Sequence, residues 1–410
     1  MASARAAKRA FFPLDEELAL LPGQLTPLLQ DHLAHLGTWM PFAKAAHMLE
    51  RFTLVAVSES SAQRHTEAVG MAYQAVQLAE VERIEQEWPE VPQGAEKLVL
   101  SVDGAFVPVV GGEWAEVKTL VVAELSQPSE VDGTASVRTH THSYFSRVAE
   151  AEAFQRLTLG ELYRRGVEKA ERLATVNDGA EWIQHFLDFH CPEARRILDF
   201  RHAAERICQI GEEVLGEGHA SLPAWRTRQL HQLKHDGPVE LLSNLRLFAA
   251  QHLSAPLISE NLSYLDKRVA QMQYPSFLSE GWPIGSGMVE SGNKLVVEAR
   301  LKGAGMHWSR LSVNPLLALR NAVCSDRWAE AWQQSAAYIR QCGVRRRPVE
   351  SKQKTSATPP EVVCTPTAAA VDREVVDPLT RRKPAANHPW RHTYQATKVR
   401  MQEEQRQAKL

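Results

Sequence analysis

The sequence has few cysteines and no long apolar run, and these absences narrow the classes of protein it can be. Its 5 cysteines are widely spaced and form no CxxC pair, which argues against a disulfide scaffold or a zinc knuckle and favours a reducing compartment. No apolar stretch of about 18 residues occurs, so no membrane span is expected. The N-terminus lacks the apolar core of a signal peptide, which favours a cytoplasmic protein.

An excess of charge of either sign is also missing. The chain has 47 basic and 49 acidic residues, so nothing in the overall balance calls for a polyanionic partner, although local charge can still bind phosphate. The charge is unevenly placed, because residues 343–410 hold 14 Lys and Arg against 7 Asp and Glu, with 7 prolines. We predict that 343–410 is a basic, Pro-rich disordered tail. The remaining length suggests roughly two or three folded parts.

Residues 1–95 predict an all-α N-terminal domain. Pro41 opens one helical stretch, Ser58 stands where the N-cap of a second short helix would, and a longer helix is expected over 71–87. Two short helices joined by a tight turn, over about 41–70, are typical of a helix-turn-helix, although helical hairpins that bind nothing share the pattern. The second helix would present polar side chains to a DNA groove, namely Ser60, Gln63 and Arg64.

The central part changes to short, β-branched runs. We expect strands near 97–103, 105–110 and 117–124, a helix from about Tyr144 to Val167, and two further strands that end at Asp178 and Asp199, with a helix between them. The order β-β-β-α-β-α-β predicts a mixed α/β sheet covered on its faces by helices. Three segments build this part: a first piece of the core at 96–202, a helical insertion at 203–280, and a last piece at 281–342.

Carboxylates at expected strand ends carry the chemistry. Asp103 and Asp178 each end an apolar run and precede a glycine. A carboxylate is costly at a half-buried strand end unless something pairs with it, and hard cations such as Mg²⁺ prefer such oxygens. An Asp-Gly turn is the competing explanation. A third carboxylate, Glu290, follows a Gly-rich loop and opens a helix, with Glu298 as its rival two turns on.

The ordered set of motifs resembles one family. SVDGAFV, TVNDGAEWI, RRILDFRHAAERI and IGSGMVESGNK with ARLKGAGMHW are similar to bacterial insertion-sequence transposases of the ISKra type. That family belongs to the DDE group, which has a ribonuclease H-like fold and is related to hAT and Mutator-like transposases. The similarity covers about residues 40–340, and the closing NHPWRH also resembles the family's tail.

The resemblance implies a DDE triad of Asp103, Asp178 and Glu290 that holds two Mg²⁺ ions, with Mn²⁺ as a substitute. In the related families a D-x-x-H or C-x-x-H motif follows the second catalytic Asp. Here Asp199 and His202 form such a motif 21 residues after Asp178, which makes them a supporting pair, although Asp199 as the second ligand stays open. Basic side chains would position DNA phosphates, namely Lys294, Arg300 and Lys302.

These features together predict a DNA transposase. Two-metal chemistry would hydrolyse a phosphodiester at the transposon ends and join the freed 3′-hydroxyl to target DNA. The partner is double-stranded DNA, the enzyme would act as a homo-oligomer, and the protein would lie in the bacterial cytoplasm with the nucleoid. Two alternatives remain: a helix-turn-helix protein without catalysis, such as an inactive or domesticated copy, and a ribonuclease H-like nuclease that cuts without joining.

Two minor patterns suggest other sites. His140 and His142 have metal-ligand spacing, but no second matched pair accompanies them, so a zinc site is the weaker explanation. Trp282 and Trp308 flank the Glu290 helix and could stack on bases, although tryptophans are more often part of a core.

Overall fold

The computed structural model describes residue 21 and residues 23–126, 129–131, 134–250, 252 and 255–345. The expected tail at 343–410 lies outside the described residues except for its first three, which continue the last helix, α15 (Trp328–Arg345). The NHPWRH motif also lies outside them. None of the described helices has both the length and the apolar character needed to cross a bilayer.

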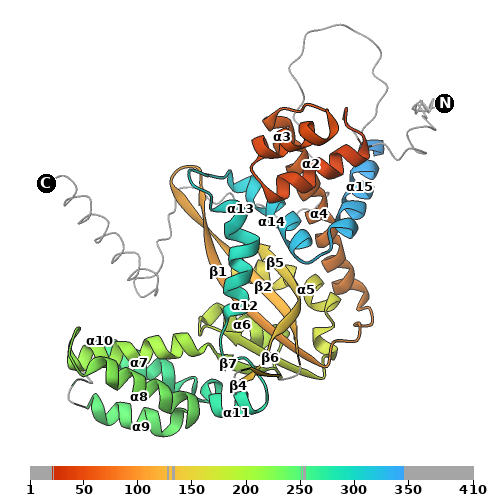
Figure 1. Cartoon of the computed structure of the whole chain (residues 1–410). Coiled ribbons are helices and arrows are strands. Elements are labelled where there is room, and N and C mark those ends of the chain that lie inside the picture. The colour runs from red at the N-terminus through yellow and green to blue at the C-terminus, as the bar shows by residue number, and fades with distance from the viewer. Residues whose placement is uncertain are drawn as a thin grey trace, which may run out of the picture. The chain divides into compact units, whose positions relative to one another are not determined.

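Five strands form one mixed sheet in the order β5-β2-β1-β6-β7 (Figure 1). Their bounds are β1 Lys97–Val109, β2 Glu113–Leu125, β5 Thr139–Arg147, β6 Arg172–Asn177 and β7 Arg195–Leu198. β2 runs antiparallel to β1 and β5, whereas β1, β6 and β7 run parallel to one another. A separate hairpin joins β3 (Ser129–Val131) to β4 (Thr134–Ser136). The prediction of a mixed α/β sheet is confirmed.

In and beside the sheet, two predictions of local structure are wrong. The strands expected at 97–103 and 105–110 are a single strand, so Asp103 lies within β1 and the Asp103-Gly104 pair makes no turn. Gly104 pairs with Lys118 there, and a Cβ at Gly104 would lie 2.8 Å from Glu116 Oε1. The helix expected from Tyr144 begins only at Ala151, because residues 139–147 pair with β2 as the edge strand β5.

Helices cover both faces of the sheet. One face packs on α5 (Ala151–Arg164) and α6 (Glu181–His190), with the one-turn helix η1 (Val167–Lys169) beside them. Much of the other face packs on a row of helices near the C-terminal end of the described chain. These are α12 (Gly287–Gly292), the π-helix η3 (Asn293–Glu298), α13 (Ala299–Leu301) and α14 (Arg310–Cys324). Figure 1 shows α12 lying over β1 and β2.

The N-terminal region is helical, as predicted, but its helices are not those of the expected pattern. They are α2 (Pro27–Trp39), α3 (Phe42–Thr53) and α4 (Glu59–Glu87). Ser58 does cap α4, since its side chain accepts a hydrogen bond from Ser61 N. The expected short helix and long helix are one continuous helix, however. Gly70 does not break it; a Cβ there would lie 2.3 Å from Pro315 O, so this glycine lets α14 cross α4 closely.

Residues 200–279 are mostly helical, in the region where a helical insertion was predicted at 203–280. Its helices are α7 (Phe200–Leu215), α8 (Leu222–His235), α9 (Pro238–Phe248), α10 (Pro256–Asp266), η2 (Val269–Met272) and α11 (Tyr274–Ser279). They share one apolar core with Val99, Ala174 and Ile197 of the sheet. The insertion is therefore packed on the strands that carry the candidate carboxylates, and it is not a detached module.

Candidate functional site

Asp103 lies within β1, and Asp178 directly follows β6, the strand that runs parallel to β1 beside it. β1 and β6 pair with a constant offset of 75 residues, and the same offset separates Asp103 from Asp178. Beyond the last backbone pair, a side chain connects the two strands: Asn177 Oδ1 accepts a hydrogen bond of 2.5 Å from Val102 N. Side chains at matching positions of paired strands point to the same face of a sheet. Continued past its last backbone pair, Leu100 with Thr175, this register would place the two carboxylates side by side.

The face that carries Asp103 is the one that α12 covers. In β1 the even-numbered residues Leu98, Leu100 and Val102 pack on α5 and α6. The odd-numbered residues Ala105 and Val107 pack with Val289 and Val296 of the helix row instead. Gly292 allows a close approach, since a Cβ there would lie 2.8 Å from Val121 Cγ2. Glu290, one turn into α12, is thus carried toward Asp103.

The pKa of Asp103 responds to the charges of the other candidate residues. The pKa of Asp103 is raised to about 6, chiefly by burial and further by the negative charges of Asp178 and Glu290, while His202 and the hydrogen bond from Gly104 N lower it. Asp103, Asp178, Glu290 and His202 therefore form one cluster. Glu298, the rival carboxylate, pairs with Lys302 at 2.6 Å instead.

Removing the charge of Asp103 is expected to stabilise the metal-free protein. The folded-state pKa of about 6 lies above the ordinary 3.8, so wild type loses stability as pH rises from about 4 to about 6. Asp103→Asn escapes this loss. Its amide oxygen can keep the bond from Gly104 N, and its NH₂ group can donate to Asn293 Oδ1 once the Asn293 amide turns over. We expect a gain on the order of 1–2 kcal/mol at pH 7 that fades below about pH 4. Thermal unfolding in EDTA across this pH range measures it. A variant advantage that grows toward low pH would contradict the assignment.

A residue that the sequence analysis did not select, Asn293, completes the cluster. Its Nδ2 donates a hydrogen bond of 2.9 Å to Asp103 Oδ2, and it lies three residues after Glu290. Asn293 is 5% exposed, yet its Oδ1 has no partner among the described residues. The sequence signal that could have identified Asn293 was its position three residues after Glu290, because residues three apart share a helix face.

Asn293 begins the π-helix, and π-turns inside helices are frequent at functional sites. A wide turn leaves backbone carbonyls that need other donors. Arg320 of α14 supplies them: its Nη2 donates to Leu295 O and its Nε donates to Val296 O at 3.2 Å. Arg320 is 1% exposed, and its Nη1 also reaches Thr38 O of α2 at 3.5 Å. The buried guanidinium thus fixes the helix that carries Glu290 and Asn293.

Asp199 has a structural role in this conformation. It is 2% exposed, and its Oδ1 accepts from Arg201 N at 2.6 Å. Its Oδ2 accepts from both the backbone N (2.9 Å) and the hydroxyl of Ser286. These bonds use both oxygens and tie the loop before α12 to the start of α7. Asp178 is the freer carboxylate, since one backbone N, that of Ala180, donates to its Oδ1 at 3.0 Å.

The helical insertion holds the loop that carries Asp178. Gly179 N donates to Tyr264 Oη at 3.0 Å, and Arg268 donates to Gly179 O at 2.5 Å. A Cβ at Gly179 would lie 2.2 Å from Tyr264 Oη. The Asp-Gly pair here therefore reflects this close approach, because Gly179 does not adopt a positive φ.

The expected DNA-contact residues fall into two groups. Ser60, Arg64, Lys294 and Lys302 are exposed and Gln63 is partly exposed, so they remain accessible to a phosphate or a base. Arg300 is not accessible: it is 2% exposed, stacks on Phe42 and Trp308 and donates to Gly37 O at 3.1 Å. The proposed phosphate contact of Arg300 is thus contradicted by its burial. Arg201 reaches the site instead, with its Nη1 3.7 Å from Glu290 Oε1.

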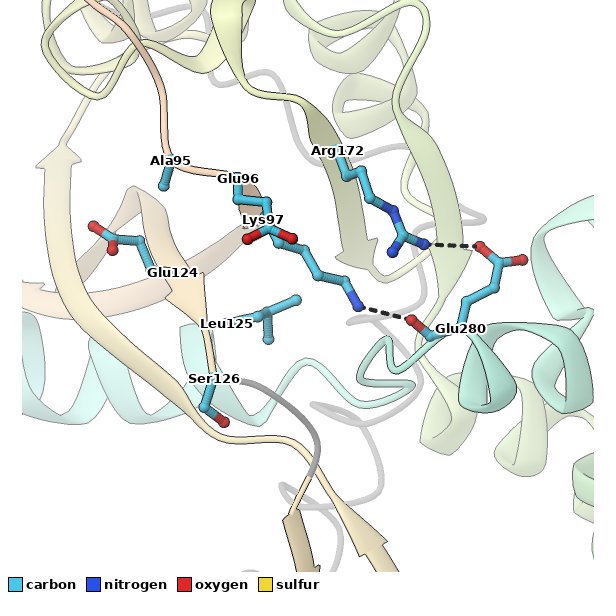
Figure 2. Close-up of a pocket in the computed structure, with 8 residues that line it drawn as sticks. All are labelled: Ala95, Glu96, Lys97, Glu124, Leu125, Ser126, Arg172 and Glu280. Carbon is cyan, nitrogen blue, oxygen red and sulfur yellow. Dashed lines mark hydrogen bonds and ion pairs between the residues drawn. The ribbon is translucent and has the colours of Figure 1, made fainter.

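A second group of charged residues lies at the other end of the strands (Figure 2). Lys97 donates to Glu280 O at 2.7 Å, and the Arg172 guanidinium lies 3.6 Å from the Glu280 carboxylate. Both cations also lie over the ring of Trp282, which is 3% exposed and hence a core residue, as is Trp308. Lys97 precedes Asp103 by six residues of strand, about 20 Å. This group anchors the loop that leads to α12 and is separate from the carboxylates.

The donor set of the carboxylate cluster fits a hard divalent cation. Asp103, Asp178 and Glu290 offer carboxylate oxygens, and the unpartnered Oδ1 of Asn293 adds an amide oxygen. Within the described residues no three His, Cys, Asp or Glu side chains form a ready-made metal cage, and Glu290 is drawn toward Arg201. His140 and His142 hydrogen-bond to neighbouring threonine hydroxyls.

Comparisons of the sequence with protein-family models and with curated proteins found no match. Function is therefore argued from the geometry of this site.

Proposed function

We propose that the protein is a DNA transposase of the DDE type, acting through Asp103, Asp178 and Glu290. One observation carries the proposal: an aspartate within β1 and an aspartate that directly follows the parallel strand β6 lie near a glutamate on a covering helix. Burial and the negative charges of Asp178 and Glu290 raise the pKa of Asp103 to about 6. Clusters of carboxylates that shift one another's pKa values in this way are typical of functional sites.

The sheet supports the same proposal. Counted along the main sheet, its strands lie in the spatial order 3-2-1-4-5, with the second antiparallel to the rest. This is the order of a ribonuclease H-like fold, which the sequence motifs imply. In that fold the catalytic carboxylates would come from the first strand, from the end of the fourth strand and from a helix near the end of the core, and Asp103, Asp178 and Glu290 belong to these three regions.

The chain's own groups have distinct tasks in this mechanism. Bound Mg²⁺ or Mn²⁺ would activate a water or 3′-hydroxyl and stabilise the leaving oxygen. Asp103, Asp178 and Glu290 would hold the cations, and Asn293 would orient Asp103 through its hydrogen bond. Arg201, with a side chain 70% exposed beside Glu290, is placed to contact a DNA phosphate, as are Lys294 and Lys302.

The remaining parts of the proposal concern DNA and location. Helices α3 and α4 would bind double-stranded DNA through Ser60, Gln63 and Arg64, in a helix-turn-helix arrangement whose second helix is unusually long. Joining two DNA ends needs more than one active site, which favours a homo-oligomer on DNA. We place the protein with the bacterial nucleoid in the cytoplasm.

A plasmid cleavage assay tests the proposal. The plasmid carries the DNA that flanks the coding region, and the reaction contains Mg²⁺ or Mn²⁺. Wild type is expected to nick or cut it and to join freed 3′ ends to target DNA, and Glu290→Gln is expected to do neither. Cutting without joining would favour the nuclease, and binding by wild type without any cutting would favour the non-catalytic DNA-binding protein.

A further inference from the structure

The loop that carries Asp178 meets the helical insertion at a single glycine. Gly179 directly follows Asp178, and a Cβ there would lie 2.2 Å from Tyr264 Oη and 2.3 Å from Arg268 Nε. Gly179 does not have a positive φ, so its backbone conformation does not require a glycine. The missing side chain serves the contact instead, because it lets α10 and the turn after it reach the backbone beside a candidate metal ligand.

Two consecutive peptide groups are held by this contact. The first joins Asp178 to Gly179, and its N–H donates to Tyr264 Oη at 3.0 Å. The second joins Gly179 to Ala180, and its carbonyl accepts from Arg268 Nη2 at 2.5 Å. A peptide group is planar and includes the Cα atoms at both of its ends. Tyr264 therefore restrains Asp178 Cα, the atom from which the carboxylate side chain extends.

The second peptide group also reaches the carboxylate itself. Its N–H, which belongs to Ala180, donates to Asp178 Oδ1 at 3.0 Å. Arg268 thus holds one end of a group whose other end positions the carboxylate. The second oxygen, Asp178 Oδ2, has no hydrogen-bond partner in the part of the chain that the structure describes. It is the oxygen that remains for a cation.

Tyr264 is held in turn by the neighbouring helix. The guanidiniums of Arg206 and Arg268 lie over its ring, with their Cζ atoms 4.5 Å and 3.9 Å from the ring centroid. Arg206 belongs to α7, and it also donates to Oδ1 of the fully buried Asn261 of α10 at 3.0 Å. Helices α7 and α10 pack side by side (Figure 1). The phenol hydroxyl therefore has a fixed position from which to hold the loop.

A second tyrosine of the insertion has a different task. Tyr274 is fully buried, and its hydroxyl donates to Leu198 O at 2.9 Å, so it ties α11 to β7. Tyr264 is only partly buried, and its hydroxyl contacts the loop of a candidate metal ligand. The two tyrosines therefore allow a role in packing to be separated from a role at the site.

We propose that Tyr264 and Arg268 are positioning residues of the metal site, which makes the helical insertion part of the machinery that binds the metal. They act through the backbone on either side of Gly179 and hold Asp178 where it can bind a divalent cation. The inference rests on the proposed function, because it takes Asp178 as a ligand of Mg²⁺ or Mn²⁺. Substituting a residue that orients a metal ligand typically weakens metal binding by about 10–100-fold.

Tyr264→Phe tests the inference, because it removes the hydroxyl that accepts from Gly179 N and keeps the ring. Mn²⁺ is titrated into the metal-free full-length protein, and free Mn²⁺ is measured by electron paramagnetic resonance. We expect the dissociation constant to rise about tenfold or more, both in this variant and in Arg268→Met. Plasmid nicking by Tyr264→Phe should recover as the Mn²⁺ concentration is raised, whereas nicking by Asp178→Asn should not.

Tyr274→Phe is the matched control. It leaves Leu198 O without its donor, so we expect a lower melting temperature with unchanged Mn²⁺ affinity. Wild-type affinity in both Tyr264→Phe and Arg268→Met would overturn the inference and leave the proposed function standing. Equal losses of affinity in Tyr264→Phe and Tyr274→Phe would also overturn it, because a general loosening of the insertion would then explain them.

The wild-type protein separates this inference from the proposed function. We expect it to bind Mn²⁺, and we expect Asp178→Asn to weaken that binding. Wild type that binds no Mn²⁺, or binding that Asp178→Asn leaves unchanged, would overturn the metal site of the proposed function and the inference with it.

Discussion

Asp178→Asn is expected to reduce metal-dependent strand cleavage by about a hundred- to a thousandfold or more, with little change in thermal stability. The amide keeps the size of the side chain and can still accept the hydrogen bond that Ala180 N donates to Asp178 Oδ1. It removes the negative charge that would hold a cation. Initial rates of plasmid nicking in Mg²⁺, measured beside the melting temperature, check both parts.

Asp199→Asn is the matched control for this experiment. An amide cannot accept from Arg201 N on one side and from Ser286 N and its hydroxyl on the other, so at least one buried donor loses its partner. We expect a loss of about 1–3 kcal/mol of folding free energy, with cleavage that is slower but still metal-dependent. A stable, inactive Asp199→Asn beside an active Asp178→Asn would exchange the roles of the two aspartates.

Arg320→Met is expected to lower the free energy of unfolding by about 3 kcal/mol, the largest stability effect of any substitution proposed here. The change leaves the carbonyls of Leu295, Val296 and Thr38 without the donor that now serves them. It also removes the contact of the guanidinium with the Trp39 ring, 4.5 Å away. Chemical denaturation measured by circular dichroism gives the free energy directly.

A matched variant distinguishes the loss of the hydrogen bonds to the π-helix from a general effect of removing a positive charge. Arg310→Met removes an exposed arginine from the first position of the same helix and is expected to change stability by less than about 0.5 kcal/mol. At a temperature where Arg320→Met remains folded, its cleavage rate should also fall, since the helix that carries Glu290 loses its support. Equal stability of the two variants would show that the carbonyls find other donors.

Local patterns predicted much of the fold. The apolar runs placed β1, β2, β6 and β7 in their correct regions, and Ser58 marked the start of α4. The errors occurred where distant residues decide the local structure. The strand was predicted to end at residue 103 and a helix near residue 70, although Gly104 pairs within β1 and Gly70 admits the backbone of Pro315 within α4. Neither contact leaves a trace in the neighbouring sequence.

The edge strand β5 was missed for a similar reason. The side chains of residues 144–147, taken alone, are compatible with either a helix or a strand. The strand is fixed by β2 on one side and by α14 on the other, where Asn321 Oδ1 accepts from Ser146 N at 3.0 Å and Asn314 Oδ1 accepts from Val148 N at 2.8 Å. These partners lie more than 160 residues further along the chain.

In the candidate site too, local sequence predicted some features and distant contacts determined the others. The three acidic residues were predicted from the ends of apolar runs and from the resemblance to a family, and the raised pKa of Asp103 is consistent with their lying near one another. The burial of Arg300 and the bond between Asn293 and Asp103 depend on how the C-terminal helices lie on the sheet. The choice between Asp178 and Asp199 likewise rests on which carboxylate Ser286 occupies.

The separation of the site residues along the chain has a consequence for the protein during its synthesis. Asp103 and Asn293 are 190 residues apart, and Arg320 must also be in place before the π-helix has its donors. A chain still attached to the ribosome can expose its N-terminal helices and most of its sheet long before these last residues emerge. Under the proposed function, such a chain would lack a complete site for cutting DNA, so the order of translation itself would keep incomplete copies from damaging the chromosome.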